Sequence, residues 1–227
     1  SPKLRDYVFE HSLNPGATSV ETPVGEAQVV LELPRGVVRA LLVVGHGAGG
    51  DIDVPDLVLL RDTAQAAGIA VASVRQPYRV AGRRAPAPAA RLDAAWIGVV
   101  QALRDAAGPF AREQRRLRGR AVVVSGRSSG ARVACRTAVA CDAAGVITCA
   151  FPLHPPGHPD RSRAGELAIE RPLLVLQGSR DAFGRPDEFP PGVRVIAVAG
   201  SDHGLKSAAF RDAADQAVAW ILQLAGS

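Results

Sequence analysis

Short apolar runs alternate with amphipathic segments along most of the chain. Apolar runs bounded by glycine, proline or polar residues predict eight strands, at residues 18–24, 27–33, 37–44, 69–74, 121–125, 146–151, 173–177 and 193–199. Apolar residues at helical spacing predict four main helices, at residues 55–67, 91–107, 129–140 and 207–224. We expect the first two strands to form an antiparallel hairpin joined at Gly25. Strands that alternate with helices in this order are typical of a mostly parallel sheet with helices on both faces.

The length of the chain suits one domain. Its 227 residues, 47% of them hydrophobic, are enough for one large core, and no repeat or linker divides residues 1–227. The first residues lack a basic start followed by an apolar run, and no apolar stretch approaches the roughly 18 residues of a membrane span. We therefore expect a soluble, cytoplasmic protein that does not contact a membrane. Because the chain begins with Ser1, a removed signal peptide stays open.

The net charge of +5 does not indicate a nucleic-acid partner. Of the 27 basic residues only two are lysines, the arginines are scattered, and aromatic residues make up only 4% of the chain. Proteins that bind nucleic acid usually concentrate positive charge on one face, often beside stacking aromatics. We expect no nucleic-acid binding, whereas an acidic small substrate stays open. The three cysteines lack metal-ligand spacing and are expected to be small buried hydrophobes.

The strongest local motif is Gly126-Arg127-Ser128-Ser129-Gly130, which lies between a predicted strand and a predicted helix. In such a G-x-S-x-G turn the serine is lifted above the sheet, and the flanking glycines remove side chains that would collide. The helix behind the serine adds backbone donors and the positive end of its dipole. We therefore predict that Ser128 is a nucleophile.

A serine hydroxyl attacks well only when a histidine takes its proton and a carboxylate orients that histidine. With this motif the acid and then the histidine follow the serine along the chain. Asp181 follows the predicted strand at 173–177, and His203 follows the one at 193–199. Of the five histidines, only His203 combines this position and order with a following helix. We predict His203 as the general base and Asp181 as its acid. The competing carboxylates are Asp187, Asp202 and Asp51.

A glycine-rich loop, His46-Gly47-Ala48-Gly49-Gly50-Asp51, follows the third predicted strand. A tetrahedral intermediate needs backbone N–H groups aimed at its oxygen, and glycines let the backbone come close. We expect the N–H groups of Ala48 and Ser129 to form this oxyanion hole, with His46 bracing the loop. A phosphate-binding loop is the competing interpretation, but the Lys-Ser/Thr ending of a P-loop and the full G-x-G-x-x-G pattern are missing.

Several polar side chains are candidates for substrate contacts. The candidates are His46, Arg127, Tyr78, Arg79 and His154. An arginine fork suits a substrate carboxylate or phosphate. Alternatively, Arg127 pairs with an internal acid such as Asp51, the other arginines are solvated, and His154 is a hydrogen-bonded structural histidine.

Five segments resemble a known family: VVGHGAGGDIDVPDL, SVRQPYRVAGRR, VVSGRSSGARVAC, FPLHPPGHPDRSR and LLVLQGSRD. They look like the short α/β-hydrolases of the type of testis-expressed protein thirty and of a subunit of the nonspecific-lethal chromatin complex, neighbours of the dienelactone-hydrolase-like enzymes. The resemblance spans residues 20–225. It implies an α/β-hydrolase fold and places Ser128, Asp181 and His203 on the triad positions. Relatives often carry Met where this chain has Ser129, which leaves the backbone N–H in place.

Between the sixth and seventh predicted strands, where larger hydrolases insert a helical lid, the chain has only a polar segment, residues 154–171. We therefore expect a lidless, shallow pocket and a small or polar acyl substrate. The predicted activity is that of a serine hydrolase that cleaves an ester, thioester or lactone through an acyl-enzyme on Ser128, with no metal or cofactor. Two alternatives stay open: a non-catalytic scaffold, and an acyltransferase or C–C hydrolase with the same triad. A homodimer could form through an edge strand.

Overall fold

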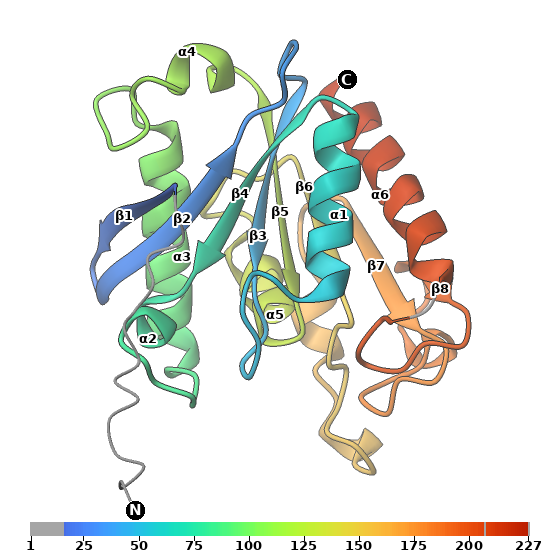
Figure 1. The fold of residues 1–227 in the computed structure, drawn as a ribbon. Helices are drawn as coiled ribbons and strands as arrows, with labels where there is room; N and C mark the ends of the chain where they lie inside the picture. Colours follow the sequence, from blue (N-terminus) through green and yellow to red (C-terminus); the bar gives the residue numbers. More distant parts are fainter. Residues whose placement is uncertain (1–15, 207, 227) are drawn as a thin grey trace, which may run out of the picture.

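The computed structural model describes residues 16–206 and 208–226, which form one twisted sheet between two layers of helices (Figure 1). The strand order across the sheet is β1-β2-β4-β3-β5-β6-β7-β8. Strands β1, β2 and β4 pair antiparallel, and every pair from β4 to β8 is parallel. The strands are β1 (Ala17–Thr22), β2 (Gly25–Glu32), β3 (Ala40–Gly45), β4 (Ile69–Arg75), β5 (Ala121–Arg127), β6 (Gly145–Cys149), β7 (Leu173–Gly178) and β8 (Arg194–Val198). The predicted eight-stranded, mostly parallel sheet is confirmed.

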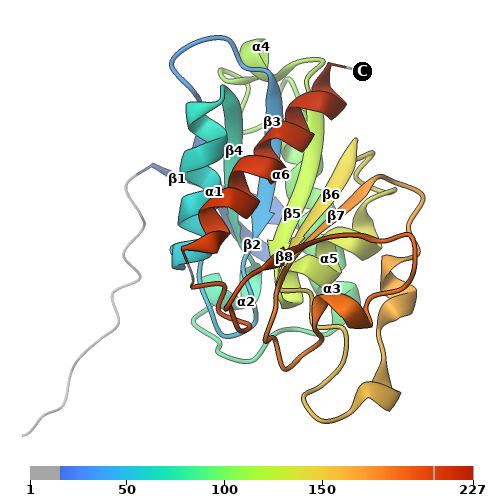
Figure 2. The same ribbon diagram turned by 90° about the vertical axis from the view of Figure 1, so that its right-hand side faces the viewer.

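Four main helices cover the two faces of the sheet (Figures 1 and 2). Helices α1 (Pro55–Ala66) and α6 (Ala209–Ala225) pack together on one face, and α3 (Ala89–Arg104) and α5 (Ser129–Thr137) pack together on the other. Two short helices, α2 (Pro77–Val80) and α4 (Gln114–Leu117), lie in the connections before and after α3. The start of the last predicted helix, Ser207, lies outside the described residues.

The central strands are buried on both sides, which explains their continuous apolar sequence. In β3, Leu41 and Val43 belong to the core under α3 and α5, while Leu42 and Val44 belong to the core under α1 and α6. The alternation follows from the two-residue period of a strand. Each of these buried side chains stabilises the fold by about 1.5–3 kcal/mol relative to an exposed one.

Several predicted strand boundaries were wrong. The hairpin turns at Pro23 and Val24 rather than at Gly25, which is the first residue of β2. Strand β3 begins at Ala40 rather than at Val37, which is 74% exposed. Strand β6 ends at Cys149 because the next residue has a positive φ of 50°, which extended backbone does not tolerate.

Two predicted helices end one turn early. Helix α3 ends at Arg104 rather than at residue 107, because the Asp105 carboxylate accepts a hydrogen bond from the Ala107 N–H and draws the backbone into a turn. Helix α5 ends at Thr137, and the chain then reverses through Asp142, whose φ is 44°. Both ends depend on local polar turns that apolar periodicity does not reveal.

The connection from β6 to β7 contains two short 3-10 turns, Pro159–Arg161 and Ala164–Leu167, in place of a helical lid. Glu166 in the second turn accepts two hydrogen bonds from Arg132, at 2.9 and 2.6 Å, and a third from Arg136 at 3.4 Å. The segment is therefore tied to α5. Arg132 therefore pairs with an internal acid of the same domain.

The three cysteines are buried and unpaired with one another, as predicted. Burial raises the pKa of Cys135 to about 12 and that of Cys141 to about 11, so both are protonated thiols at neutral pH. None of the helices in the described part of the chain combines the length and the apolar character that a bilayer span requires.

Candidate active site

Ser128 occupies a strained turn between β5 and α5. Its φ of 52° and ψ of −111° are unusual for a residue with a side chain. A Cβ added to Gly126 would lie 2.3 Å from the carbonyl carbon of Gly130. Both glycines are therefore required for the sharp turn, which places the serine at the carboxyl edge of the parallel strands.

A chain of hydrogen bonds joins Ser128 to His203 and Asp181. The Ser128 Oγ lies 2.9 Å from His203 Nε2, and His203 Nδ1 lies 2.8 Å from Asp181 Oδ2. With the proton on Nδ1 donated to the carboxylate, Nε2 is free to accept the serine proton. Asp181 follows β7 and His203 follows β8, so parallel neighbouring strands bring together residues 75 and 22 positions apart.

Asp181 is held in a fully buried network. Its side chain is 0% exposed, Oδ1 accepts a hydrogen bond from the Phe183 N–H at 2.8 Å, and Oδ2 accepts one from Gln177 Nε2 at 2.9 Å. The Gln177 amide also bonds the backbone N–H of Phe151 at 2.9 Å and the carbonyl of Gly184 at 2.8 Å. Gln177 therefore fixes the orientation of the carboxylate.

Two of these neighbours were missed by sequence reasoning. The sequence pattern predicts Gln177 only as the last residue of an apolar strand. A polar residue at the end of such a strand is the sequence signal that could have marked it as a partner of the site. The ring of Phe183 lies 4.3 Å from that of His203, centroid to centroid, with a 34° tilt. This contact limits rotation of the imidazole and covers one of its faces.

The glycine-rich loop after β3 packs directly against the elbow. A Cβ on Gly130 would lie 2.6 Å from the carbonyl oxygen of His46, and a Cβ on Gly47 would lie 3.5 Å from the Ser128 Cβ. Ser129 is the first residue of α5, so its N–H is among the donors that a helix does not satisfy internally. The Ala48 carbonyl accepts a hydrogen bond from the Tyr78 hydroxyl at 3.1 Å, which fixes the peptide beside the elbow.

His46 is a buried brace whose ring nitrogens are both used inside the protein. Nδ1 donates to the Gly47 carbonyl at 2.8 Å, and Nε2 accepts from the Gln76 N–H at 3.1 Å. Burial lowers the pKa of His46, which agrees with the neutral ring that these two bonds require. The expected bracing role matches this geometry, whereas neither ring nitrogen is left for a substrate.

Arg127 also turns inward. Its Nε donates to Asp56 Oδ2 at 2.9 Å, and its Nη2 donates to the backbone carbonyl of His203 at 2.8 Å. Burial raises the pKa of Asp56, and the neighbouring guanidinium opposes this rise. Asp51 was the wrong internal partner, because it pairs with Arg75 at 2.8 Å. The Arg127 guanidinium, which was expected to bind a substrate anion, instead links α1 to the loop that carries His203. We call this pair of contacts the clamp.

The other three candidates for substrate contact, His154, Tyr78 and Arg79, differ in their surroundings. His154 lies between the Pro155 carbonyl, 2.9 Å from Nδ1, and Glu188 Oε2, 2.8 Å from Nε2, so it follows the structural alternative. Tyr78 is buried; its hydroxyl donates to the Ala48 carbonyl, and its ring lies 5.8 Å from that of His46, centroid to centroid. Arg79 is partly exposed beside Tyr78 and stays a candidate for substrate contact.

The chain belongs to the alpha/beta hydrolase domain family, whose sequence profile matches residues 38–221. No curated protein sequence matches the chain closely enough to count as a relative. The narrower resemblance to the testis-expressed and nonspecific-lethal proteins stays a prediction.

Solved structures with the same fold share little sequence with it. XC6422 from Xanthomonas campestris, described as a serine hydrolase without a lid, is 19% identical with a TM-score of 0.70, over 90% of this chain and 93% of that one. Dienelactone hydrolase from Anabaena variabilis is 18% identical with a TM-score of 0.69, over 91% and 96%. Est1E from Butyrivibrio proteoclasticus is 12% identical with a TM-score of 0.66, over 93% and 100%. These similarities establish the α/β-hydrolase fold.

Proposed function

We propose that the protein is a serine hydrolase that cleaves an ester, thioester or lactone of a small or polar acyl substrate through an acyl-enzyme on Ser128. The observation that carries the proposal is the continuous chain from the Ser128 hydroxyl through His203 to the buried carboxylate of Asp181, with links of 2.9 and 2.8 Å. A solvated serine in a loop needs neither a strained turn nor an oriented imidazole, and here both occur together.

The proposed reaction has two halves. Ser128 Oγ attacks the acyl carbon while its proton moves to His203 Nε2, and the backbone N–H groups of Ala48 and Ser129 stabilise the negative charge on the former carbonyl oxygen. The tetrahedral intermediate collapses, and the alcohol, thiol or ring oxygen leaves with the proton from His203. A water molecule then gives a proton to His203, attacks the acyl-enzyme and releases the acid, and the proton returns to Ser128. Asp181 stabilises the imidazolium at each stage.

The substrate class follows from the surroundings of Ser128 and from the comparisons. The 3-10 turns between β6 and β7 leave the site without a helical cover, which suits a small or polar acyl group better than a long apolar chain. The similar structures include a dienelactone hydrolase, esterases and an Est1E complex with ferulic acid. Lactone and ester substrates are therefore the first to try.

The test is hydrolysis of p-nitrophenyl esters from acetate to octanoate by the wild type, Ser128→Ala and Ser129→Ala. The proposal predicts turnover that is fastest with short acyl chains and that falls at least about 10³-fold in Ser128→Ala. Ser129→Ala is the matched control because it keeps the backbone N–H, and its kcat should stay within a few-fold of the wild type. Turnover that survives in Ser128→Ala would contradict the proposal, and transfer to an added alcohol would assign an acyltransferase.

A further inference from the structure

A cavity lies at the opposite edge of the sheet from Ser128. It has a volume of about 610 Å³ and is bounded by α4, the carboxyl ends of α3 and α6, and the amino ends of β3 and β5. In Figure 1 this is the end of the molecule where α4 and the C-terminus lie. The proposed triad is at the carboxyl ends of the same strands, so the two sites are separated by the length of the sheet.

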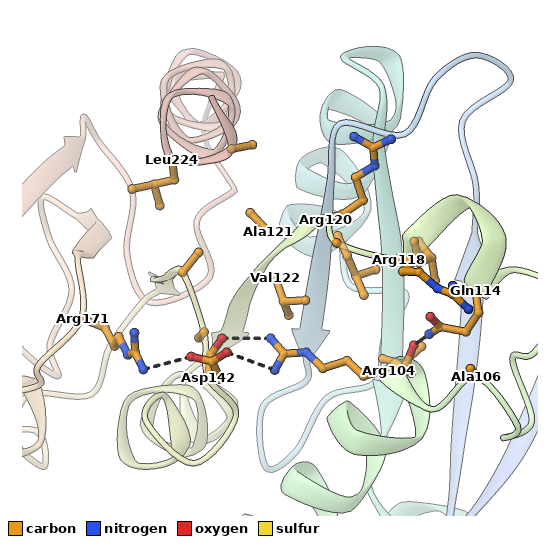
Figure 3. A pocket seen from close by; sticks show the side chains of 17 residues that line it. Arg104, Ala106, Gln114, Arg118, Arg120, Ala121, Val122, Asp142, Arg171 and Leu224 are labelled. Carbon is orange, nitrogen blue, oxygen red and sulfur yellow. Dashed lines mark hydrogen bonds and ion pairs between the residues drawn. The ribbon is translucent and has the colours of Figure 1, made fainter. Parts of the chain in front are cut away.

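The cavity combines an apolar floor with a basic rim. Apolar side chains in its lining include Leu41, Leu103, Val122 and Leu224. Four arginines, Arg104, Arg118, Arg120 and Arg171, share the lining with one carboxylate, that of Asp142. Figure 3 shows the four guanidinium groups on different sides of the cavity rather than in one cluster. The volume falls in the range of about 300–1,000 Å³ that is usual for small-molecule sites.

Asp142 fixes two of the guanidinium groups. Arg104 Nη2 donates to its backbone carbonyl at 2.9 Å, and Arg171 Nη2 donates to its carboxylate at 3.2 Å (Figure 3). Asp142 itself sits in a left-handed turn with a φ of 44°. Asp142 thus holds two arginines at the edge of the cavity, and its single carboxylate, which also lies 3.8 Å from Arg104 Nη1, neutralises only part of their charge.

One buried donor in the lining remains without an acceptor. The Nε of Arg171 is buried and has no hydrogen-bond partner in the structure as described. Arg118 and Arg120 are exposed at the rim of the cavity. Leaving a buried donor without an acceptor is unfavourable, so an occupant that supplies an acceptor to Arg171 Nε would be stabilised here.

The negative ends of two helix dipoles could attract these arginines without any ligand, but they do not balance the positive charge of the lining. Helices α3 and α6 end beside the cavity, and the carboxyl end of a helix carries roughly half a negative charge that favours nearby cations. The four arginines and the Asp142 carboxylate leave a net charge of about +3 in the lining. Two helix ends, at roughly half a negative charge each, offset about one of these three positive charges. The cavity keeps an excess of positive charge.

We propose that this cavity binds a small polyanion, a molecule with two or more phosphate or carboxylate groups that reach guanidinium groups on separate sides. Arginine forks bind such groups through paired charge-assisted hydrogen bonds, and the apolar floor accommodates the body of the ligand. The site does not depend on the proposed hydrolase activity.

Calorimetric titration with tripolyphosphate at an ionic strength of about 0.15 M tests the proposal, because screening there suppresses long-range attraction to the net charge. The wild type should bind one tripolyphosphate, and orthophosphate should bind at least about tenfold more weakly. Citrate in the same titration distinguishes carboxylate from phosphate ligands. Absence of binding by both tripolyphosphate and citrate would overturn the proposal.

The variants Arg118→Ala/Arg120→Ala and Arg83→Ala/Arg84→Ala remove the same charge from two exposed places, only the first of which lines the cavity. The first variant should weaken tripolyphosphate binding at least about tenfold, and the second should leave it unchanged. If both variants weakened tripolyphosphate binding equally, the binding would reflect attraction to net charge alone, and the proposed site in the cavity would be wrong.

Discussion

Arg127 donates a hydrogen bond from Nη2 to the backbone carbonyl of His203 across 2.8 Å. The same guanidinium is held at Nε by Asp56, whose side chain is only 1% exposed at the start of α1. The residue before the proposed nucleophile therefore restrains the loop that carries the proposed base. The Asp56 carboxylate restrains that arginine in turn.

Arg127→Met should destabilise the fold and reduce kcat. The substitution leaves the Asp56 carboxylate buried without its partner, which costs about 3–5 kcal/mol for a buried pair. Chemical denaturation measures the change in the free energy of unfolding. Arg61→Met is the matched control on α1, because the carboxylates around Arg61 are 37–65% exposed and their loss should cost about 1 kcal/mol or less.

The double variant Asp56→Leu/Arg127→Met separates stability from positioning. Replacement of both members of a buried ion pair by apolar residues is often neutral, so much of the lost stability should return. The kcat should stay low, because the His203 carbonyl still lacks its donor. Full recovery of kcat together with stability would show that Arg127 has no positioning role.

Gln177→Leu should impair both the fold and the site. Leucine is close in size but leaves the backbone N–H of Phe151 and the carbonyl of Gly184 without their side-chain partner, at a cost of at least about 2 kcal/mol. Asp181 also loses one of its donors, so kcat should fall while KM changes little. Steady-state kinetics on the folded variant checks this. A selective rise in KM would argue that Gln177 acts on substrate binding instead.

The proposed triad could be predicted from the sequence because its signals are local and ordered. The Gly126–Gly130 motif lies between an apolar strand and a helix, and Asp181 and His203 each follow a later apolar run. In a parallel sheet the loops after such runs gather at one edge, so chain order was enough to select both residues.

The clamp around the triad could not be predicted, because its contacts join segments without a shared local pattern. Arg127 and Asp56 are 71 positions apart, and Asp56 looks like an ordinary acidic residue in the first turn of a helix. The end of β6 before Ala150 and the reversal at Asp142 depend on positive φ values at non-glycine residues, which hydrophobic periodicity does not encode.

Gly130→Ala should damage the site through close packing. The new Cβ would lie 2.6 Å from the His46 carbonyl oxygen, so α5 and the glycine-rich loop must separate. Overpacking of this kind costs about 1–3 kcal/mol, and the displaced Ala48 and Ser129 amides should lower kcat. Gly165→Ala is the control, because nothing lies within 4 Å of its added Cβ. Equal effects on kcat in the two variants would contradict this account.

The His154–Glu188 pair should make stability depend on pH. The bond to the Pro155 carbonyl, then the bond to Glu188, raises the pKa of His154 in the folded protein. A raised folded pKa adds stability that is fully present below the unfolded pKa of about 6.5 and is lost as the pH rises through the folded value. The free energy of unfolding should therefore fall over that range.

Glu188→Gln should flatten this pH dependence, because the acceptor next to His154 loses its charge. The difference between wild type and variant should be on the order of 1 kcal/mol near pH 6 and should shrink at higher pH. Glu170→Gln, at an exposed position, is the matched control. A difference that grows as the pH rises would contradict the pairing.

Labelling with a fluorophosphonate, followed by intact mass and peptide mapping, tests the central claim most directly, because the reagent modifies only a serine that a base has activated. The account predicts one adduct per chain on Ser128, lost in Ser128→Ala and slowed strongly in His203→Gln, with Ser129→Ala labelled like the wild type. An unlabelled folded wild type, or an adduct at another residue, would contradict the assignment of Ser128 as an activated nucleophile and would favour a binding scaffold.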